Sequence, residues 1–148
     1  MYIWTCLKND RKMDIKSQIT GVQHVGVPTD DLAASVDFYR TLGFETEYET
    51  YNAAADERVT FMRLKNLVME IYENRRATHR DGAVDHVALD VSRIDSLFAF
   101  YKGLGLKMLE DKVSYLPFWE HGIRYFIVVG PNDEKIEFCE RLKEPFRG

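Results

Sequence analysis

Two histidines and two glutamates stand at equivalent places in the two halves of this 148-residue sequence. A shift of 62 positions places His24 on His86, and a shift of 67 positions places Glu70 on Glu137. The shorter shift also aligns a series of apolar residues and glycines that follow the histidines, which predicts two similar modules. Imidazole nitrogens and carboxylate oxygens together suit a divalent transition-metal ion. The repeated residues therefore indicate a metal site to which both modules contribute.

The expected strands place each histidine on the face that points away from a helix. Side chains alternate between the two faces of a strand. In the strand expected over 18–28, Val25 and Val27 lie on the face that packs under a helix, and His24 lies on the other face. The strand expected over 83–91 places His86 in the same way. A single histidine in a strand is usually a hydrogen-bonded core or rim residue, so neither imidazole is decisive alone.

The two glutamates follow the same alternation inside apolar runs. Glu70 lies in the strand expected over 67–73, and Glu137 lies in the strand expected over 134–140. A strand glutamate is usually exposed at a sheet edge, but burying a carboxylate costs several kcal/mol unless a cation compensates its charge. No lysine or arginine is placed periodically to pair with both acids. We therefore expect two concave faces that enclose one cavity, in which a divalent cation binds both carboxylates and both imidazoles.

The expected ligand set does not select one metal. Two nitrogens and two oxygens suit Zn²⁺, Ni²⁺, Co²⁺, Mn²⁺ or Fe²⁺, and a closed structural zinc site is not expected without a thiolate. Four protein ligands leave two positions of a six-coordinate ion for water or for two adjacent substrate oxygens, as in Lewis-acid catalysis. Tyr72 and Cys139 share the faces of the glutamates, where they either line the pocket and bind substrate or fill the core.

The elements that must position these residues recur in the same order in both modules. Apolar residues at helical spacing predict helices over 32–42 and 94–104, each followed by a glycine. The aspartates at 30–31 are N-cap candidates, and Ser92 with Asp95 resembles a capping box. Strands are expected over residues 18–28, 44–52, 57–65 and 67–73, and again over 83–91, 106–113, 122–130 and 134–140. The pattern predicts an α+β fold, in which two βαβββ modules form a curved, barrel-like mixed sheet with the helices outside.

The composition is that of a globular domain without a nucleic-acid or membrane signature. Hydrophobic residues make up 45% of the chain, and the net charge is −4 with no basic stripe, so neither disorder nor nucleic-acid binding is expected. No apolar run is long enough to cross a bilayer. The two cysteines supply no disulfide framework, which makes the cytoplasm the expected compartment. Residues 1–14 are expected to be a tail and 15–148 a single domain, with module one over 18–75 and module two over 83–142.

These residues lie in segments that resemble the vicinal oxygen chelate superfamily, and within it the metal-dependent glyoxalase I (lactoylglutathione lyase) enzymes. The resemblance covers roughly residues 19–142 and rests on the segments "HVGVPTDDLAASVDFYRTLGF", "LVMEIYEN", "DHVALDV" and "GPNDEKIEFCE". It implies paired modules around a metal-lined cavity, a homodimer and a small-molecule substrate. The metal ligands that it implies are His24, Glu70, His86 and Glu137.

The glyoxalase I resemblance implies an isomerisation. A hemithioacetal, formed from a 2-oxoaldehyde and a thiol, chelates the metal ion, which stabilises an enediolate. Glu137 is the expected catalytic base, and Glu70 is its near-symmetric alternative. Glutathione-using members carry an arginine four residues after the first histidine, where this chain has Pro28, and an asparagine four residues after the first glutamate, which is Asn74 here. Asn74 is therefore a candidate substrate-binding residue, while the thiol cosubstrate stays open.

Other activities remain open at this point. A different enolising enzyme, such as an epimerase, would use the same metal ligands. A ring-cleaving Fe²⁺ dioxygenase needs two histidines and one carboxylate, so the additional Glu70 disfavours it. A drug-binding protein of the bleomycin-resistance type would lack the metal ligands. Arg58, Arg63 and Arg124 could bind an anionic substrate, although each is more simply a solvated strand charge, and His121 is more simply a surface residue than a cap of the cavity mouth.

Overall fold

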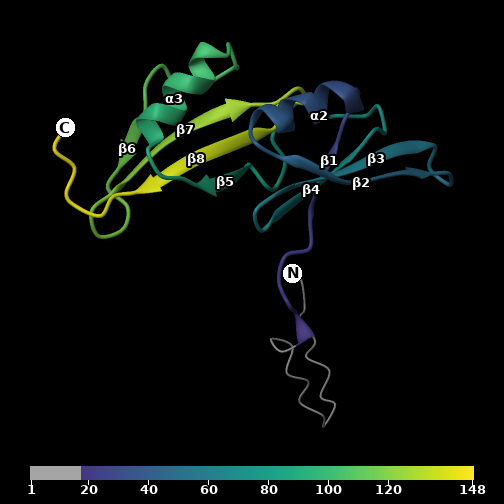
Figure 1. The fold of residues 1–148 in the computed structure, drawn as a ribbon, viewed down its shortest axis with the longest axis horizontal. Coiled ribbons are helices and arrows are strands. Elements are labelled where there is room, and N and C mark those ends of the chain that lie inside the picture. Colours follow the sequence, from purple (N-terminus) through teal and green to yellow (C-terminus); the bar gives the residue numbers. More distant parts are fainter. Residues whose placement is uncertain (1–17) are drawn as a thin grey trace, which may run out of the picture.

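A computed structural model describes residues 18–148, so the tail expected over 1–14 lies outside the described residues. Two βαβββ modules lie side by side (Figure 1). The first consists of β1 (Val25–Pro28), α2 (Leu32–Thr41), β2 (Glu45–Asn52), β3 (Glu57–Leu64) and β4 (Leu67–Tyr72). The second consists of β5 (His86–Asp90), α3 (Ile94–Gly103), β6 (Ser114–Leu116), β7 (Ile123–Val129) and β8 (Lys135–Arg141). The α+β class and the repeated element order are confirmed.

Each module contains a mixed four-stranded sheet with its first strand at one edge. The strand orders are β1-β4-β3-β2 and β5-β8-β7-β6. β1 runs parallel to β4 and β5 runs parallel to β8, while the other neighbouring strands are antiparallel. The register sets Gly26 opposite Glu70 and Ala88 opposite Glu137. The last strand of each module therefore brings its glutamate beside the start of the first strand, where the histidine lies.

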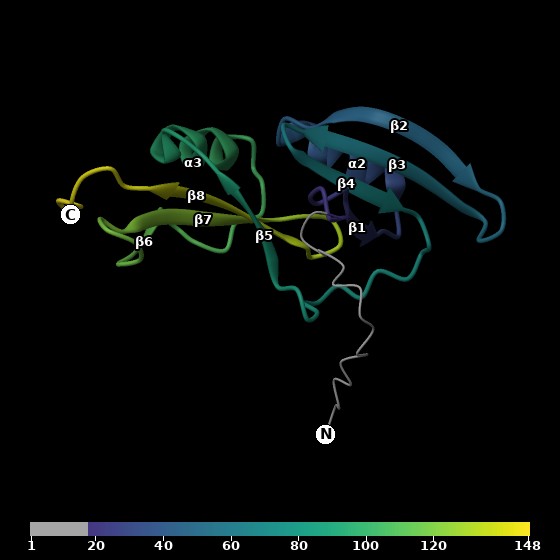
Figure 2. The same cartoon turned by 90° about the horizontal axis from the view of Figure 1, so that it is seen from below.

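One helix packs on one face of each sheet and buries the apolar residues of that face. In the first module Tyr39 of α2 and Met69 and Ile71 of β4 are almost fully buried. In the second module, which Figure 2 shows with α3 along β7 and β8, the ring of Tyr101 lies 5.1 Å from that of Phe138. Removal of this apolar surface from water stabilises both modules. Because side chains alternate, the residues between these core positions lie on the face without a helix.

The start of α3 differs from the prediction. The capping box expected at Ser92 does not form, because the N-cap residue is Arg93, which has a left-handed φ of 62° and no side-chain cap. The carboxylate of Glu140 in β8 accepts the backbone N–H groups of Arg93 and Ile94 instead, at 3.0 and 3.1 Å. An acid that is close only in the folded chain thus replaces the local cap.

The strand expected over 106–113 is also not formed as predicted. Met108 makes an isolated bridge to Val128, and the short strand β6 follows only at 114–116. The carboxylate of Glu110 accepts the N–H of Ile127 at 2.7 Å. A side chain therefore occupies a position that a backbone carbonyl would take in a regular ladder, which interrupts the strand.

The two sheets stay separate within the chain. β1 and β5 each have a neighbour on one side only, so the modules do not close into the barrel-like sheet that the sequence predicted. The strand expected over 18–28 forms only at Val25–Pro28, since its partner β4 begins at Leu67 and pairs with β1 from Met69 onward. Each module consequently presents an unpaired strand edge within the described chain.

Buried polar side chains join the two modules. The Thr29 hydroxyl lies 2.8 Å from that of Ser35 and 3.1 Å from Oδ1 of Asn132, in the loop between β7 and β8. The hydroxyl of Tyr39 donates to Glu134 at 3.3 Å, and burial raises the pKa of both groups. These bonds connect the start of α2 with the second module, so the modules of one chain are held beside each other.

The segment between the modules carries a histidine to which the sequence assigned no role. Nε2 of His79 lies 2.6 Å from Asp30 and Nδ1 lies 3.1 Å from Asp133, which also pairs with Lys107. Hydrogen bonds to Asp30 and then to Asp133 raise the pKa of His79. A carboxylate only accepts hydrogen bonds, so both ring nitrogens donate and the imidazolium form is favoured. Within residues 18–148 no helix is long and apolar enough to cross a membrane.

Candidate metal site

The first module holds one histidine–glutamate pair on its open face. Nε2 of His24, directly before β1, lies 3.1 Å from Oε2 of Glu70 in β4. Nδ1 of His24 lies 3.0 Å from Oε1 of Gln23, and its ring packs edge-to-face on Phe61 at 5.7 Å. Gly26 lies beside the pair, where a Cβ would make an ordinary van der Waals contact with Glu70 at 3.7 Å. The sequence alternation placed both members of this pair correctly.

The second module repeats the arrangement. Nε2 of His86 lies 3.2 Å from Oε2 of Glu137 in β8, and Nδ1 lies 2.8 Å from Oδ2 of Asp85. Asp85 in turn accepts a hydrogen bond from Lys135 at 3.2 Å. The hydrogen bond with His86, and then that with Lys135, lowers the pKa of Asp85, so this acid stays ionised beside the imidazole.

The donors of each pair fit a divalent cation. Two donors that are about 2.1 Å from one ion and about at a right angle lie about 3 Å apart, close to both observed separations. In both pairs Nδ1 has a hydrogen-bond acceptor beside it. When a cation binds between Nε2 and the glutamate, the ring keeps its proton on Nδ1 and directs the Nε2 lone pair at the cation. The ring nitrogens that face the glutamates are therefore the ones prepared to bind a metal.

One chain does not bring all four donors together. Among residues 18–148, no three histidine, cysteine, aspartate or glutamate side chains are grouped so that they could hold a metal ion. The structure unites His24 with Glu70 and His86 with Glu137, but leaves the two pairs in separate sheets. Each module thus provides half of the expected ligand set, next to the unpaired edge of β1 or β5.

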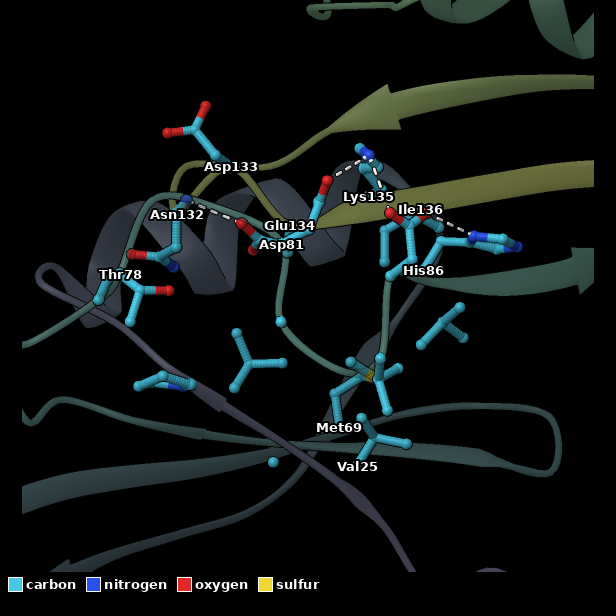
Figure 3. A pocket seen from close by; sticks show the side chains of 18 of the residues that line it. Val25, Met69, Thr78, Asp81, His86, Asn132, Asp133, Glu134, Lys135 and Ile136 are labelled. Carbon is cyan, nitrogen blue, oxygen red and sulfur yellow. Dashed lines mark hydrogen bonds and ion pairs between the residues drawn. The ribbon is translucent and has the colours of Figure 1, made fainter.

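A cavity of about 270 Å³ lies between the modules, and it is distinct from a four-ligand site. Val25 and Met69 lie on one side of it, while Asp81, Lys135 and His86 lie on the opposite side (Figure 3). Of the four expected ligands only His86 lines this cavity. The space is therefore a gap between two sheet edges, with one histidine at its border.

Solved structures share this fold. The glyoxalase family protein from Enterococcus faecalis superposes with a TM-score of 0.69 at 20% identity, over 83% of this chain and 99% of that one. The fosfomycin resistance protein FosX from Listeria monocytogenes, in complex with Mn(II) and sulfate, superposes with a TM-score of 0.66 at 16% identity, over 84% of this chain and 95% of that one. At these identities the similarity establishes the architecture.

The sequence comparison agrees with the fold. The family model of the Glyoxalase/Bleomycin resistance protein/Dioxygenase superfamily matches residues 21–84, which contain the first module. The match covers less than half of the 148 residues of the chain. The uncharacterized protein YwbC from Bacillus subtilis (strain 168) is 25% identical over 125 residues, which are 81% of this chain and 97% of that protein.

The candidate substrate-binding residues have different surroundings. Tyr72 lies on the open face, where a Cβ on Gly26 would be 3.5 Å from its ring. Cys139 lies two residues after Glu137 on the same face, and burial together with Glu137 raises the pKa of its thiol to about 11. The thiol is therefore protonated near neutral pH. Asn74 follows β4 and accepts the N–H of Arg76 at 2.9 Å, so its amide oxygen is engaged in a turn.

The three arginines considered as anion-binding residues are already paired with carboxylates. Arg58 makes two hydrogen bonds with Glu73, at 2.7 and 2.8 Å. Arg63 pairs with Glu47 at 2.8 Å, and Arg124 pairs with Asp95 at 2.7 Å. His121 lies 3.7 Å from Glu120. None of these three guanidinium groups is therefore free for a substrate anion.

Sequence reasoning missed the residues that orient the two imidazoles. Gln23 and Asp85 directly precede the histidines and are related by the same shift of 62 positions as His24 and His86. Both offer a hydrogen-bond acceptor to Nδ1. Their equivalent positions and shared acceptor chemistry were the signal that could have identified them.

Proposed function

We propose that this protein is a metal-dependent enzyme of glyoxalase I type, which isomerises the hemithioacetal of a 2-oxoaldehyde and a thiol. The observation that carries the proposal is the pair of imidazoles whose Nε2 atoms lie 3.1 and 3.2 Å from glutamate carboxylates, with both Nδ1 atoms occupied. His24, Glu70, His86 and Glu137 would bind a divalent ion such as Zn²⁺, Ni²⁺, Co²⁺, Mn²⁺ or Fe²⁺.

The four ligands are completed by a second copy of the chain. A single copy supplies two separate half-sites, each beside an unpaired edge strand. In a homodimer β1 of one subunit lies beside β5 of its partner, so that His24 and Glu70 of one subunit meet the His86–Glu137 pair of the other. Pairing of the edges also satisfies backbone groups that an exposed edge leaves open. Two-fold symmetry then produces two equivalent metal sites.

The residues of the two open faces have distinct roles in the proposed reaction. When bound, a divalent cation supplies Lewis-acid stabilisation of the negative charge that develops on two adjacent substrate oxygens. The Glu137 carboxylate removes the proton from the substrate carbon and returns it to the neighbouring carbon. Glu137 is 14% exposed and Glu70 is 28% exposed, so water competes less for the oxygens of Glu137. Tyr72 and Cys139 line the same faces and exclude water from the substrate.

Substitution of the base tests this proposal. Glu137→Gln removes the proton acceptor but keeps the shape of the side chain and an oxygen donor. We expect turnover of the methylglyoxal–thiol hemithioacetal to fall at least about a hundredfold, while elemental analysis shows partial retention of the metal. Glu120→Gln, at a side chain that is 87% exposed, is the matched control and leaves both quantities unchanged. Wild-type turnover in Glu137→Gln would remove this glutamate from the mechanism.

A second candidate function is metal-dependent action on fosfomycin. The fold similarity to the Mn(II) complex of FosX favours this alternative, which would use the same four ligands. Incubation of the Mn²⁺-loaded protein with fosfomycin and with the hemithioacetal separates the two activities. Consumption of fosfomycin without isomerisation of the hemithioacetal would replace the first proposal. Protein that cannot be loaded with Zn²⁺, Ni²⁺ or Mn²⁺ would favour metal-free drug binding.

A further inference from the structure

The segment that links the two modules is attached to both of them by one histidine. Nε2 of His79 lies 2.6 Å from Asp30, directly before the N-cap residue of α2, and Nδ1 lies 3.1 Å from Asp133, in the loop that leads into β8. Asp30 belongs to the first module and Asp133 to the second. One imidazole thus connects the start of a helix in one module with the start of a strand in the other.

The charged groups around this imidazole favour its doubly protonated form. Among residues 18–148, the charges that act on His79 are those of Asp30 and Asp133. Asp30 also accepts the backbone N–H of Ala77 at 3.0 Å, and Asp133 also accepts Lys107 at 3.1 Å. The hydrogen bonds from His79 and then Ala77 lower the pKa of Asp30, and those from Lys107 and then His79 lower the pKa of Asp133. Both acids therefore stay ionised over the whole range in which a histidine titrates.

Other polar contacts attach the modules beside this histidine. Oδ1 of Asn132 accepts the Thr29 hydroxyl at 3.1 Å, and the Tyr39 hydroxyl donates to Glu134 at 3.3 Å. Thr29 and Asn132 carry no charge at any pH, so they keep the modules in contact when the imidazole loses its proton. Glu134 is a second titratable group of the junction, and burial raises its pKa. His79 adds a separate attachment, which restricts how the modules can tilt about these contacts.

Two residues of the charged attachment have an unfavourable backbone conformation. His79 has a φ of 51° and Asp133 has a φ of 62°, both in the left-handed region. A residue other than glycine adopts this conformation at a cost, which the surrounding structure must offset. Hydrogen bonds between charged groups are among the stronger ones, and here they offset part of that cost. Loss of one of them therefore favours relaxation of the linking segment away from the junction.

We propose that His79 is a pH-sensitive clamp, which holds the two modules of a chain in one relative position when its imidazole is charged and releases them when it is neutral. A neutral imidazole donates a single hydrogen bond, so one of the two acids then loses its partner. Because hydrogen bonds to Asp30 and Asp133 raise the pKa of His79, the clamp is complete below pH 6.5 and is lost as the pH rises through the higher pKa of the folded protein. The clamp does not depend on the proposed reaction.

Proton NMR measures the charge of the clamp. The ring Cε1–H resonance of His79, assigned by its absence in His79→Gln, should titrate with a pKa above 6.5. Asp30→Asn and Asp133→Asn should each lower this pKa, because each removes a charge that favours the imidazolium. Glu120→Gln removes an exposed acid beside His121 and should leave the titration of His79 unchanged. A pKa of His79 at or below 6.5, or one that neither substitution lowers, would overturn the proposal.

The distance between two nitroxide labels measures the relative position of the modules. Asp37 in α2 and Ala99 in α3 are exposed and can each be replaced by a labelled cysteine, in a full-length chain that carries Cys6→Ser and Cys139→Ser. An excess of unlabelled protein ensures that a dimer contains at most one labelled chain. We expect a narrow distribution of distances at about pH 5.5 and one about twice as broad at about pH 9, because the released modules sample more than one relative position.

Substitutions of His79 separate the clamp from the titration of other groups. His79→Arg keeps a permanently charged donor, so its distribution should stay narrow at about pH 9. His79→Gln carries no charge and should give the broad distribution at both pH values. His121→Gln removes another histidine of the second module and should behave as the wild type. A distribution that broadens equally in His79→Arg would assign the change to another group, such as Glu134, and a wild-type distribution that does not change with pH would exclude the clamp.

Discussion

At the scale of the residue, each candidate metal-binding histidine is oriented by the residue that precedes it. The side-chain oxygens of Gln23 and Asp85 lie at hydrogen-bond distance from Nδ1 of His24 and His86, respectively. This contact directs each Nε2 towards a glutamate. Such neighbours of a ligand fix its tautomer and ring orientation before the metal arrives. Asp85 is the stronger hydrogen-bond acceptor of the two, because its carboxylate is ionised and itself accepts a hydrogen bond from Lys135.

Removal of this support should weaken the metal site without removing a ligand. We expect Asp85→Ala to lower the affinity for Zn²⁺ about 10- to 100-fold, measured by calorimetric titration. Asp85→Asn keeps an oxygen acceptor and should lower the affinity for Zn²⁺ by a smaller factor. Asp111→Ala removes a surface acid from the same module and serves as the control. An unchanged affinity in Asp85→Ala would show that Asp85 does not prepare His86 for the metal.

At the scale of the element, a second duplicated pair of glutamates caps the N-termini of the two helices. Glu73 follows β4 and accepts the N–H of Leu32 at 3.0 Å, at the start of α2. Glu140 in β8 accepts the N–H groups that open α3. A negative charge at this end of a helix satisfies free N–H donors and interacts favourably with the helix dipole. The shift of 67 positions that relates Glu70 to Glu137 also relates Glu73 to Glu140, but it does not reveal that the role of this second pair is structural.

The first of these glutamates predicts a loss of stability in acid. The hydrogen bonds from Arg58 and then from Leu32 lower the pKa of Glu73 from 4.5 to about 2. A lowered pKa in the folded state means that the ionised carboxylate stabilises the protein above pH 4.5, and that this contribution is lost as the pH falls from 4.5 towards 2. We expect Glu73→Gln to lower the free energy of unfolding by about 2 kcal/mol at pH 7, measured by urea denaturation.

The effect of Glu73→Gln should disappear at low pH. Between pH 4.5 and pH 2 the unfolded chain binds a proton that the folded wild-type carboxylate does not yet bind, so the deficit should shrink steadily and be nearly gone at pH 2. Glu47→Gln breaks the exposed pair with Arg63 and should change stability by less than about 0.5 kcal/mol at any pH. If the Glu73→Gln deficit were the same at pH 7 and pH 3, ionisation of Glu73 would not be its cause.

At the scale of the whole molecule, the division of the ligands between two modules makes the proposed site depend on two chains. Mixing two inactive variants tests this directly. One carries His24→Ala and Glu70→Gln, and the other carries His86→Ala and Glu137→Gln. In a mixed dimer, one site combines the intact module of each chain. Refolding an equimolar mixture should therefore restore about a quarter of the wild-type activity, measured with the hemithioacetal.

The same mixture distinguishes the alternative arrangement. If each site were built within one chain, every site would lack two ligands and the mixture would stay inactive. Size-exclusion chromatography of the two variants, alone and mixed, serves as the control that both still form dimers. Activity of either variant alone would contradict the four-ligand site itself.

Local patterns predicted some elements closely and others poorly. The strand expected over 57–65 is observed at Glu57–Leu64, because its apolar residues alternate and its neighbours in the chain are its partners in the sheet. The strand expected over 106–113 is interrupted, because the Glu110 side chain accepts an N–H of β7. The cap predicted at Ser92 is replaced by Glu140, which is remote in sequence. In both failures a contact between residues far apart in sequence competed with a local preference.

The sequence by itself determined the duplicated order of elements and the face on which His24, Glu70, His86 and Glu137 lie. Both follow from the period-two alternation of a strand, which is a local property. Only the tertiary structure decided that the two histidine–glutamate pairs remain apart in one chain, and that Glu140 closes the start of α3. These features depend on strand edges and on partners far apart in sequence, and no spacing along the chain records which edges meet.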